Sequence, residues 1–319
     1  MLRLTTADPD QIETILDGTY PIWGEGLSRP AYSAWNQAQM RTAWGRQHLR
    51  RMALIGGETL LASAKRYDFN AWIGFDLTPV MGLGAVFTPE PLRRHGHGRT
   101  LMNLLLQDAE TRGCRYALLF SEIGPAYYES FGFLVLPREM RTIAVDRLKG
   151  PPATFVRSGE PGDLPAIADI AARYSAGSAF GLQRTASLIE YAFARRRLLV
   201  GLGPTGLRHT EFFVAEEGHR PVAYVFITHG PAGSMLEECG DCDPDGARVG
   251  AILQVLAART PAEPVLRLTT WLPESFRPPQ LRVIGSQPAA ELMMYRPIGD
   301  APALETTASP IVYWQTDVF

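Results

Sequence analysis

Apolar and polar positions between residues 82 and 133 follow two different periods, which together predict a strand, a turn, a helix and a second strand. Gly82 to Phe87 is a short apolar run, as in a strand. Thr100 to Arg112 has the spacing of a helix face, with apolar residues at Leu101, Leu104, Leu105 and Ala109. Tyr116 to Phe120 is again a short apolar run. This order places the start of the helix beside a glycine-containing turn.

The turn from Arg93 to Gly98 reads RRHGHG and has the composition of an anion site. The first N–H groups of a helix lack partners inside it, and the helix dipole makes that end partially positive. Gly96 and Gly98 have no Cβ to block a close ligand, so the turn suits a phosphate or pyrophosphate. The Lys-Ser/Thr ending of a nucleotide P-loop is missing, and the glycine spacing is not that of a dinucleotide fold. An ordinary turn without a ligand remains the alternative on these residues alone.

Two motifs in this stretch resemble those of the GNAT superfamily of acetyltransferases. The family's phosphate turn, Arg/Gln-x-x-Gly-x-Gly/Ala, is matched by Arg93, Gly96 and Gly98. Its later Tyr-x-x-x-Gly-Phe motif is matched by residues 128–133, at the right separation. Ser121 stands where the family commonly has an asparagine. The resemblance implies binding of acetyl-CoA, with turn amides on the pyrophosphate and a strand along the pantetheine arm.

The resemblance also implies which residues contact the cofactor. For the pantetheine these are Ala85, Val86 and Phe87. For the pyrophosphate they are Arg93, Arg94, His95, Gly96, His97, Gly98, Arg99 and Thr100.

Catalysis would need a general acid and a base. Tyr128 is the expected acid, donating a proton to the departing thiolate. Glu122 and Glu90 are candidate bases, although each also fits a solvated loop carboxylate. The apolar and aromatic ending SPIVYWQTDVF resembles that of enhanced-intracellular-survival type acetyltransferases, which implies that the carboxylate of Phe319 reaches the active site. Simple packing of this tail on a domain surface is the alternative.

The segment before residue 82 predicts further strands and helices. Residues 2–6 favour a strand, and Asp8 to Leu16 favours a helix capped by Asp8. Residues 19–44 are rich in aromatics, which predicts a helical layer over the sheet or a wall of the acceptor cleft. Two apolar runs around Gly56-Gly57 indicate a hairpin, and Tyr67 to Phe75 is expected to be a connecting loop.

The second half repeats this order of elements. A closing strand at residues 140–145 and a linker at Gly150-Pro151-Pro152 precede a new strand, helix, hairpin, strand, helix and strand between residues 155 and 270. The counterpart of the phosphate turn, Gly240 to Asp245, carries three aspartates, so this half is expected not to bind CoA. Cys239 and Cys242 lack a second pair at zinc spacing, and no metal site is expected.

Composition narrows the class of protein. The 319 residues carry a net charge of −2, which favours neither nucleic acid nor an anionic membrane as a partner. No apolar run reaches membrane-spanning length, and no signal peptide is evident. Three cysteines, including Cys114 between the predicted helix and strand, suggest a reducing, cytoplasmic setting without disulfides.

These observations predict an α/β protein of two tandem GNAT-like domains, each a mixed, mostly antiparallel twisted sheet flanked by helices. Residues 1–148 would form the catalytic domain and residues 149–319 a degenerate one. The expected function is acetyl-CoA-dependent N-acetylation of a primary amine on a small molecule or peptide. A non-catalytic acyl-CoA sensor or scaffold, and transfer of a longer acyl group, remain alternatives. The aromatics with Glu25, Asp68 and Glu90 are compatible with a cationic amine acceptor.

Overall fold

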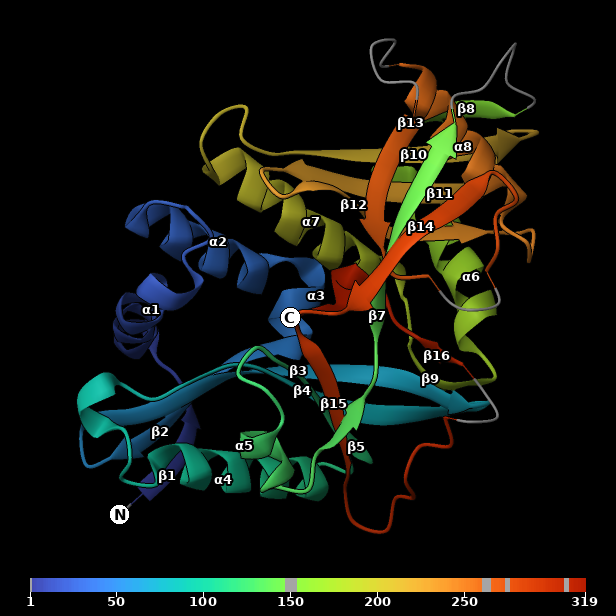
Figure 1. The fold of residues 1–319 in the computed structure, drawn as a ribbon. Coiled ribbons are helices and arrows are strands. Elements are labelled where there is room, and N and C mark those ends of the chain that lie inside the picture. The colour runs from blue at the N-terminus through green and yellow to red at the C-terminus, as the bar shows by residue number, and fades with distance from the viewer. Residues whose placement is uncertain (1, 147–153, 260–264, 273–275, 307–309) are drawn as a thin grey trace.

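Two twisted β-sheets, each covered by helices, make up the computed structural model of this protein (Figure 1). It describes residues 2–146, 154–259, 265–272, 276–306 and 310–319. The predicted linker at Gly150-Pro151-Pro152 and the predicted boundary between residues 148 and 149 lie outside the described residues.

The N-terminal part of the chain supplies most of the first sheet. Its elements are β1 (Leu2–Thr6), α1 (Pro9–Trp23), α2 (Arg29–Arg41), α3 (Ala43–His48), β2 (Leu49–Gly56), β3 (Thr59–Gly74), β4 (Asp76–Phe87), α4 (His97–Thr111), β5 (Tyr116–Ser121), α5 (Ala126–Glu129), β6 (Leu134–Leu136) and β7 (Glu139–Asp146). The strand order is β1-β2-β3-β4-β5-β15-β6, where β15 is Leu292–Pro297. Two further strands, β9 (Ser178–Leu182) and β16 (Ile311–Val312), join this sheet through pairing of β9 with β3. Among the described strands of this sheet, β4 pairs in parallel with β5 and β9 with β16, and the other pairs are antiparallel.

The C-terminal part supplies most of the second sheet, which also contains a pair of parallel strands joined through a helix. Its elements are β8 (Phe155–Ser158), α6 (Leu164–Ser175), β9 (Ser178–Leu182), α7 (Ala186–Leu202), β10 (His209–Glu217), β11 (Arg220–Gly230), β12 (Gly233–Asp241), α8 (Ala247–Ala258), β13 (Val265–Thr270), β14 (Leu281–Pro288), β15 (Leu292–Pro297) and β16 (Ile311–Val312). The order is β14-β7-β13-β12-β11-β10-β8, with β12 and β13 parallel and joined through α8 as β4 and β5 are through α4. The predicted repeat of elements and the predicted fold class are confirmed.

The two sheets exchange strands. β7, the predicted closing strand, pairs with β13 and β14 in the second sheet. β15 in turn lies between β5 and β6 of the first sheet. Sheet membership therefore does not follow chain order, and the proposed division of the chain at residue 148 stays a prediction.

The first sheet buries both faces, in different ways. One face packs on α4 through a cluster that includes Met81, Leu83 and Leu105. The other face carries Tyr67 and Phe69 toward α7 and the C-terminal tail. Figure 1 accordingly places the C-terminus near the centre of the molecule, between the two sheets. This central position is where the candidate site lies.

Two local predictions are corrected. Tyr67 to Phe75 is not a loop, because β3 continues to Gly74 and forms a hairpin with β4. The side chains of Tyr67, Phe69 and Ala71 point inward at period two, a strand pattern that the aromatic composition obscured. The first helix keeps the predicted Asp8 cap, completed by Gln11, but runs on to Trp23.

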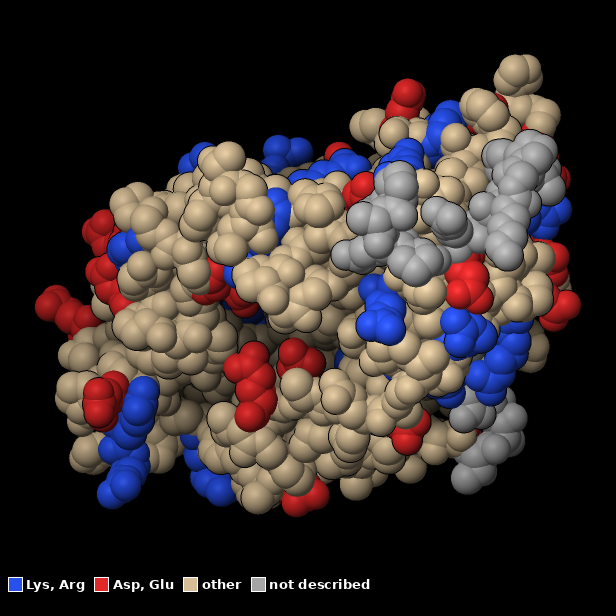
Figure 2. Space-filling model, turned by 45° about the horizontal axis from the view of Figure 1, so that its top comes forward, with Lys and Arg blue, Asp and Glu red and all other residues tan. Residues whose placement is uncertain are grey.

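Charged side chains of both signs are found on the surface. Figure 2 shows basic and acidic side chains interspersed over one face of the molecule. None of the helices within the described residues is both long and apolar enough to cross a membrane.

Candidate functional site: a groove and a cavity that meet at Tyr128

The start of α4 is an uncapped helix end. Gly96 is the N-cap residue with φ +81°, a left-handed conformation that favours glycine, and no side chain caps the helix. The first bond of the helix runs from the Thr100 N–H to the Gly96 carbonyl at 2.9 Å. The amides of residues 97–99 therefore have no partner within the helix and present its positive end.

These amides open onto a groove of about 480 Å³. Of the predicted cofactor residues, eight line it: Val86, Phe87, Arg93, Arg94, Gly96, His97, Gly98 and Arg99. Ala85 lines the neighbouring cavity instead. His95 and Thr100 are not among the lining residues: the His95 ring stacks on that of His97, and the Thr100 hydroxyl donates to the Gly96 carbonyl at 3.2 Å. The sequence thus found the turn but could not tell which of its side chains face the groove.

A bulge in β4 separates that strand from β5. Ala85 has φ +47°, and the β3–β4 register shifts between Ser63 and Lys65. The parallel ladder between β4 and β5 ends at Leu83 opposite Leu119, although both strands continue. The groove enters the molecule where the two strands part.

Tyr128 lies where the groove meets a second cavity of about 270 Å³, and it lines both. The side chain is 8% exposed, and among the described residues its hydroxyl forms no hydrogen bond. Burial, helped by Tyr127 and the nearby Glu122, raises the pKa of Tyr128 to about 12. The phenol is therefore protonated at neutral pH.

The predicted carboxylates differ in position. Glu122 follows β5, lines the second cavity and accepts a hydrogen bond from Trp23 Nε1 at 3.3 Å. Glu90 is exposed in the short 3₁₀ turn Glu90–Leu92 and lines neither space. Asp68 is paired with Arg66 and Arg112, away from the cavity, whereas Glu25 lines it.

Phe319 lies within the second cavity, on the bare surface of two glycines in β4. Its ring is 4.6 Å from that of Tyr67, centroid to centroid, and a Cβ on Gly82 would approach it to 2.7 Å. A Cβ on Gly84 would lie 3.0 Å from a carboxyl oxygen of Phe319. The close approach of Phe319 to β4 requires glycine at both positions. The two glycines of Met81–Gly84 in the sequence could have indicated that another part of the chain packs closely on this strand.

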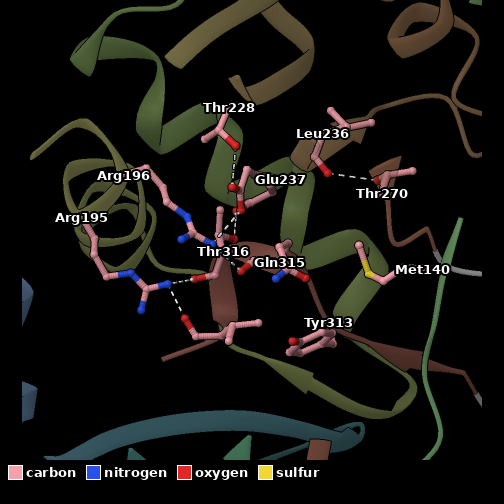
Figure 3. Close-up of polar contacts among 12 residues, drawn as sticks. Met140, Arg195, Arg196, Thr228, Leu236, Glu237, Thr270, Tyr313, Gln315 and Thr316 are labelled. Carbon is pink, nitrogen blue, oxygen red and sulfur yellow. Dashed lines mark hydrogen bonds and ion pairs between the residues drawn. The ribbon is translucent and has the colours of Figure 1, made fainter. Parts of the chain in front are cut away.

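A buried polar network holds the tail in place. Arg184, between β9 and α7, pairs with Asp317 and Glu238, and all three side chains are buried. Thr316 Oγ1 donates to Glu238 at 2.6 Å. Figure 3 shows Arg195 of α7 donating to backbone carbonyls of the tail, those of Thr316 and Val318. The tail is thus fixed from both sides rather than frayed.

Removing Arg184 should destabilise the protein and release the tail. Arg184→Met would leave two buried carboxylates without their cation, a change that costs about 3–5 kcal/mol in comparable sites. Burial already raises the pKa of Asp317, which Arg184 counteracts. Denaturant titration measures the loss. The control Arg115→Met, which breaks an exposed pair with Asp300, should change stability little. Equal stability of the two variants would contradict this account of the tail.

In the second half the equivalent helix end is filled by the protein itself. Gly246 caps α8 with φ +74°, as Gly96 caps α4. Here, however, the Asp241 carboxylate accepts hydrogen bonds from the amides of Arg248 and Val249 at 2.8 and 3.0 Å. A carboxylate occupies the place that a phosphate would need, which supports the prediction that this half does not bind CoA.

The structure brings together two histidines that are far apart in sequence. His209 and His229 face each other on β10 and β11, and their ligand atoms lie with that of Glu211 within 4.8 Å of one another. Glu211 also contacts Arg259, and His229 also bonds Ser234. Because these two residues already have protein partners, we assign the cluster no metal.

Other residues of the cavity were missed from sequence. Lys65 of β3, Arg195 of α7 and Glu291 all line it with Tyr128 and Phe319. Of the aromatic segment at residues 19–44, Trp23, Tyr32 and Trp35 lie on helices α1 and α2 and line this cavity. Whether the cavity takes the acceptor stays a prediction. Nothing in the local pattern marks Arg195, because its position depends on packing between α7 and the tail.

Comparison with known proteins agrees with this geometry. Residues 22–136 match the family described as acetyltransferase (GNAT) domain, whereas no curated protein sequence matches the chain. Among solved structures, the fold is similar to that of a GCN5-related N-acetyltransferase from Anabaena variabilis, at 10% identity and a TM-score of 0.68 over 94% of this chain and 73% of that one.

Two further solved structures are similar to this chain in fold. Eis1 from Mycobacterium abscessus has 13% identity and a TM-score of 0.55 over 93% of this chain and 73% of its own. A tandem GNAT protein from the clavulanic acid biosynthesis pathway has 11% identity and a TM-score of 0.53 over 95% of this chain and 100% of its own. Residues 22–136 therefore match a GNAT acetyltransferase domain, and the two-sheet fold of the chain is similar to that of a tandem GNAT protein.

Proposed function

We propose that this protein is an acetyl-CoA-dependent N-acetyltransferase that acts on a primary amine. The observation that carries the proposal is the meeting, at Tyr128, of a groove headed by a free helix N-terminus and a cavity that holds the Phe319 carboxylate. One space has the groups to bind a diphosphate, and the other has the groups to handle protons.

The residues of the groove fit coenzyme A. The amides of residues 97–99 point to one place, and a Cβ at Gly96 would meet nothing within 4 Å, so a pyrophosphate could approach closely. Arg94 and its neighbours add positive charge. The pantetheine would lie along Val86 and the Ala85 bulge, where β4 and β5 part. When bound, acetyl-CoA would supply an activated acetyl thioester.

The cavity side chains would move the protons. A carboxylate, from Phe319 or Glu122, would take a proton from the acceptor ammonium, and the neutral nitrogen would form the new N–C bond as the C–S bond breaks. Tyr128, held protonated, would donate its proton toward the departing sulfur. Phe319 is the better base of the two, because the tail network fixes it, whereas Glu122 is exposed and bonded to Trp23.

The cysteines agree with a reducing compartment. Cys114, Cys239 and Cys242 are free, and the first two are buried. We therefore retain a cytoplasmic location as part of the proposal.

Calorimetric titration of acetyl-CoA tests the binding step. Gly98→Val would put a branched side chain at the helix end, where even a Cβ would come within 2.9 Å of Tyr127 Oη. Loss of one charge-assisted hydrogen bond, worth about 1.5–3 kcal/mol, would weaken binding by roughly tenfold or more. The control Gly162→Val introduces a side chain where nothing lies within 4 Å. No heat from the unmodified protein would refute the assignment.

Release of free thiol from acetyl-CoA with a panel of amines tests the reaction itself. An acyl-CoA sensor would bind the cofactor without accelerated release, whereas a transferase would release thiol only with its acceptor. The same assay with longer acyl-CoA compounds tests the alternative acyl chain lengths.

A further inference from the structure

Two positive side chains face each other inside the first sheet without a carboxylate between them. Arg51 of β2 and Lys65 of β3 are directly opposite in the antiparallel register. Arg51 is 2% exposed and makes one side-chain hydrogen bond, from Nη2 to Asn36 Oδ1 at 2.9 Å, while its Nε and Nη1 lack a partner. Like charges directly opposite on neighbouring strands destabilise a sheet. We therefore expect the Arg51–Lys65 pair to lower the stability of the fold, and stability alone does not account for its presence.

Lys65 itself has no anionic partner. Among the described residues its ammonium forms neither a hydrogen bond nor an ion pair, and it lies 5.7 Å from the centre of the Trp35 ring. Burial, with Arg51 and Arg195 nearby, lowers the pKa of Lys65 well below its usual value. The side chain is one of only two lysines in the chain, the other being Lys149.

A third cation, Arg195, approaches from α7. Its side chain is 6% exposed, and its Nη2 donates hydrogen bonds to the uncharged backbone carbonyls of Thr316 and Val318. The titratable groups near the three cations are the phenols of Tyr32, Tyr67 and Tyr191 and the terminal carboxyl group of Phe319 in the same cavity. Burial raises the pKa of Tyr67 and of Tyr191, so these two phenols are uncharged. Within the described residues, no carboxylate forms an ion pair with any of the three cations.

The Lys65 side chain faces the cavity that contains Tyr128 and Phe319. Lys65 and Arg195 line the same cavity as Tyr128 and Phe319. Lys65 is opposite Gly84 in the β3–β4 register, and opposite residues share a sheet face. That face of Gly84 is the one against the Phe319 carboxyl group. Lys65, Arg195 and the Phe319 carboxyl group, a candidate base, therefore lie in one cavity on the same side of the sheet.

Both signs of charge line this cavity, in a way that suits a zwitterion. Glu25, Glu122 and Glu291 line it together with the cations. A simple diamine would bring a second positive charge toward Lys65 and Arg195, which opposes its binding, whereas an amino acid would bring a carboxylate that neutralises them.

We propose that Lys65, with Arg195 beside it and Arg51 behind it, forms an anion subsite that binds the carboxylate of the acceptor. The acceptor is then an amino carboxylate whose amine lies toward Tyr128 and Phe319. The proposal rests on the proposed acetyl transfer and narrows its substrate class from the cationic amines considered from sequence to those that also carry a carboxylate.

Matched pairs of amines that differ by one carboxylate test the proposal. Ornithine against putrescine, and lysine against cadaverine, keep the amine and change only the anionic group. The unmodified protein should show a kcat/KM at least about tenfold higher for the amino acid of a pair, as one charge-assisted contact would give. A third pair, O-phosphoethanolamine and ethanolamine, tests a phosphate in place of the carboxylate. If the ratio of kcat/KM within this pair exceeds the ratio within either amino acid pair, the subsite binds phosphate rather than carboxylate.

Variants locate the preference. Lys65→Met keeps the aliphatic stem and should bring the ratio of kcat/KM within each pair close to one, whereas Lys65→Arg should keep most of it. Arg66→Met is the matched control, because the neighbouring Arg66 forms an ion pair with Asp108 of α4 and does not line the cavity. It should leave the ratio unchanged. Equal losses for both members of a pair in Lys65→Met, or a preference for diamines in the unmodified protein, would overturn the subsite.

A binding measurement separates failure of the subsite from failure of the proposed function. If no amine releases thiol, the acetyl-transfer assignment fails, but ornithine can still be titrated calorimetrically into the protein. Loss of ornithine binding in Lys65→Met, with binding retained in Arg66→Met, supports the subsite. Absence of binding to the unmodified protein, or binding unaffected by the variant, contradicts it.

Discussion

Replacing Tyr128 with phenylalanine should lower kcat for acetyl transfer by roughly 100-fold, the usual contribution of a positioned proton donor, while acetyl-CoA affinity changes little. The ring would keep its contacts with Tyr127 and Phe133, because only the hydroxyl is removed. That hydroxyl forms no hydrogen bond with the described residues, so its loss leaves no buried partner unsatisfied. Steady-state kinetics and calorimetry on one preparation measure the two effects.

The pH profile gives an independent check on Tyr128. A general acid acts only while protonated, and its activity is lost as the pH rises through its pKa. With a pKa raised to about 12, Tyr128 should cause no fall in kcat/KM between pH 7 and pH 10. The matched variant Tyr127→Phe removes a hydroxyl one position away that lines only the groove, and it should retain most of kcat. Equal turnover of Tyr128→Phe and the unmodified protein would exclude the phenol from the reaction.

The parts of the fold that sequence predicted are those set by local chemistry. Asp8 caps α1, the Gly96 turn opens α4, and both hairpins form where glycine turns separate apolar runs. Each depends on residues within a few positions of one another. The pattern therefore carried enough information before any tertiary contact was known.

What sequence missed depends on distant partners. The run at Leu292–Pro297 is apolar enough for a strand, but nothing in it says that it pairs with β5 rather than with β13. Lys65 reads as an ordinary polar position in an alternating strand. Its isolation appears only when Arg51 faces it and Arg195 arrives from α7. Both halves of the chain line the cavity of Tyr128 and Phe319, so local patterns could name these two residues but not the charged side chains around them.

The strand exchange gives the second half of the chain a structural role in the first sheet and its cavity. β15 completes the first sheet, α7 supplies Arg195, and the tail carries Phe319 onto Gly82 and Gly84. Meanwhile Asp241 closes the phosphate position of the second half with its own carboxylate. The second half therefore supplies residues to the cavity of Tyr128 and Phe319, while its own helix end at α8 is occupied by Asp241.

Converting the terminal carboxylate of Phe319 to a carboxamide should reduce kcat/KM for the amine by roughly 10²–10³, as removal of a general base does. The amide can be made enzymatically from a chain extended by one glycine, and it keeps the ring on Gly82. Acetyl-CoA affinity should persist, since the groove is unchanged.

Two comparisons separate the effect of the Phe319 charge on activity from any effect of amidation on the packing of the C-terminal tail. Unfolding of the amidated protein should resemble that of the unmodified one, because Arg184 still binds Asp317 and Arg195 still binds the Val318 carbonyl. Glu122→Gln tests the competing base, and its effect should be smaller, because Glu122 is exposed and already accepts from Trp23. Full activity of the carboxamide, combined with a large loss in Glu122→Gln, would transfer the role of base to Glu122 and leave the tail as a wall of the cavity.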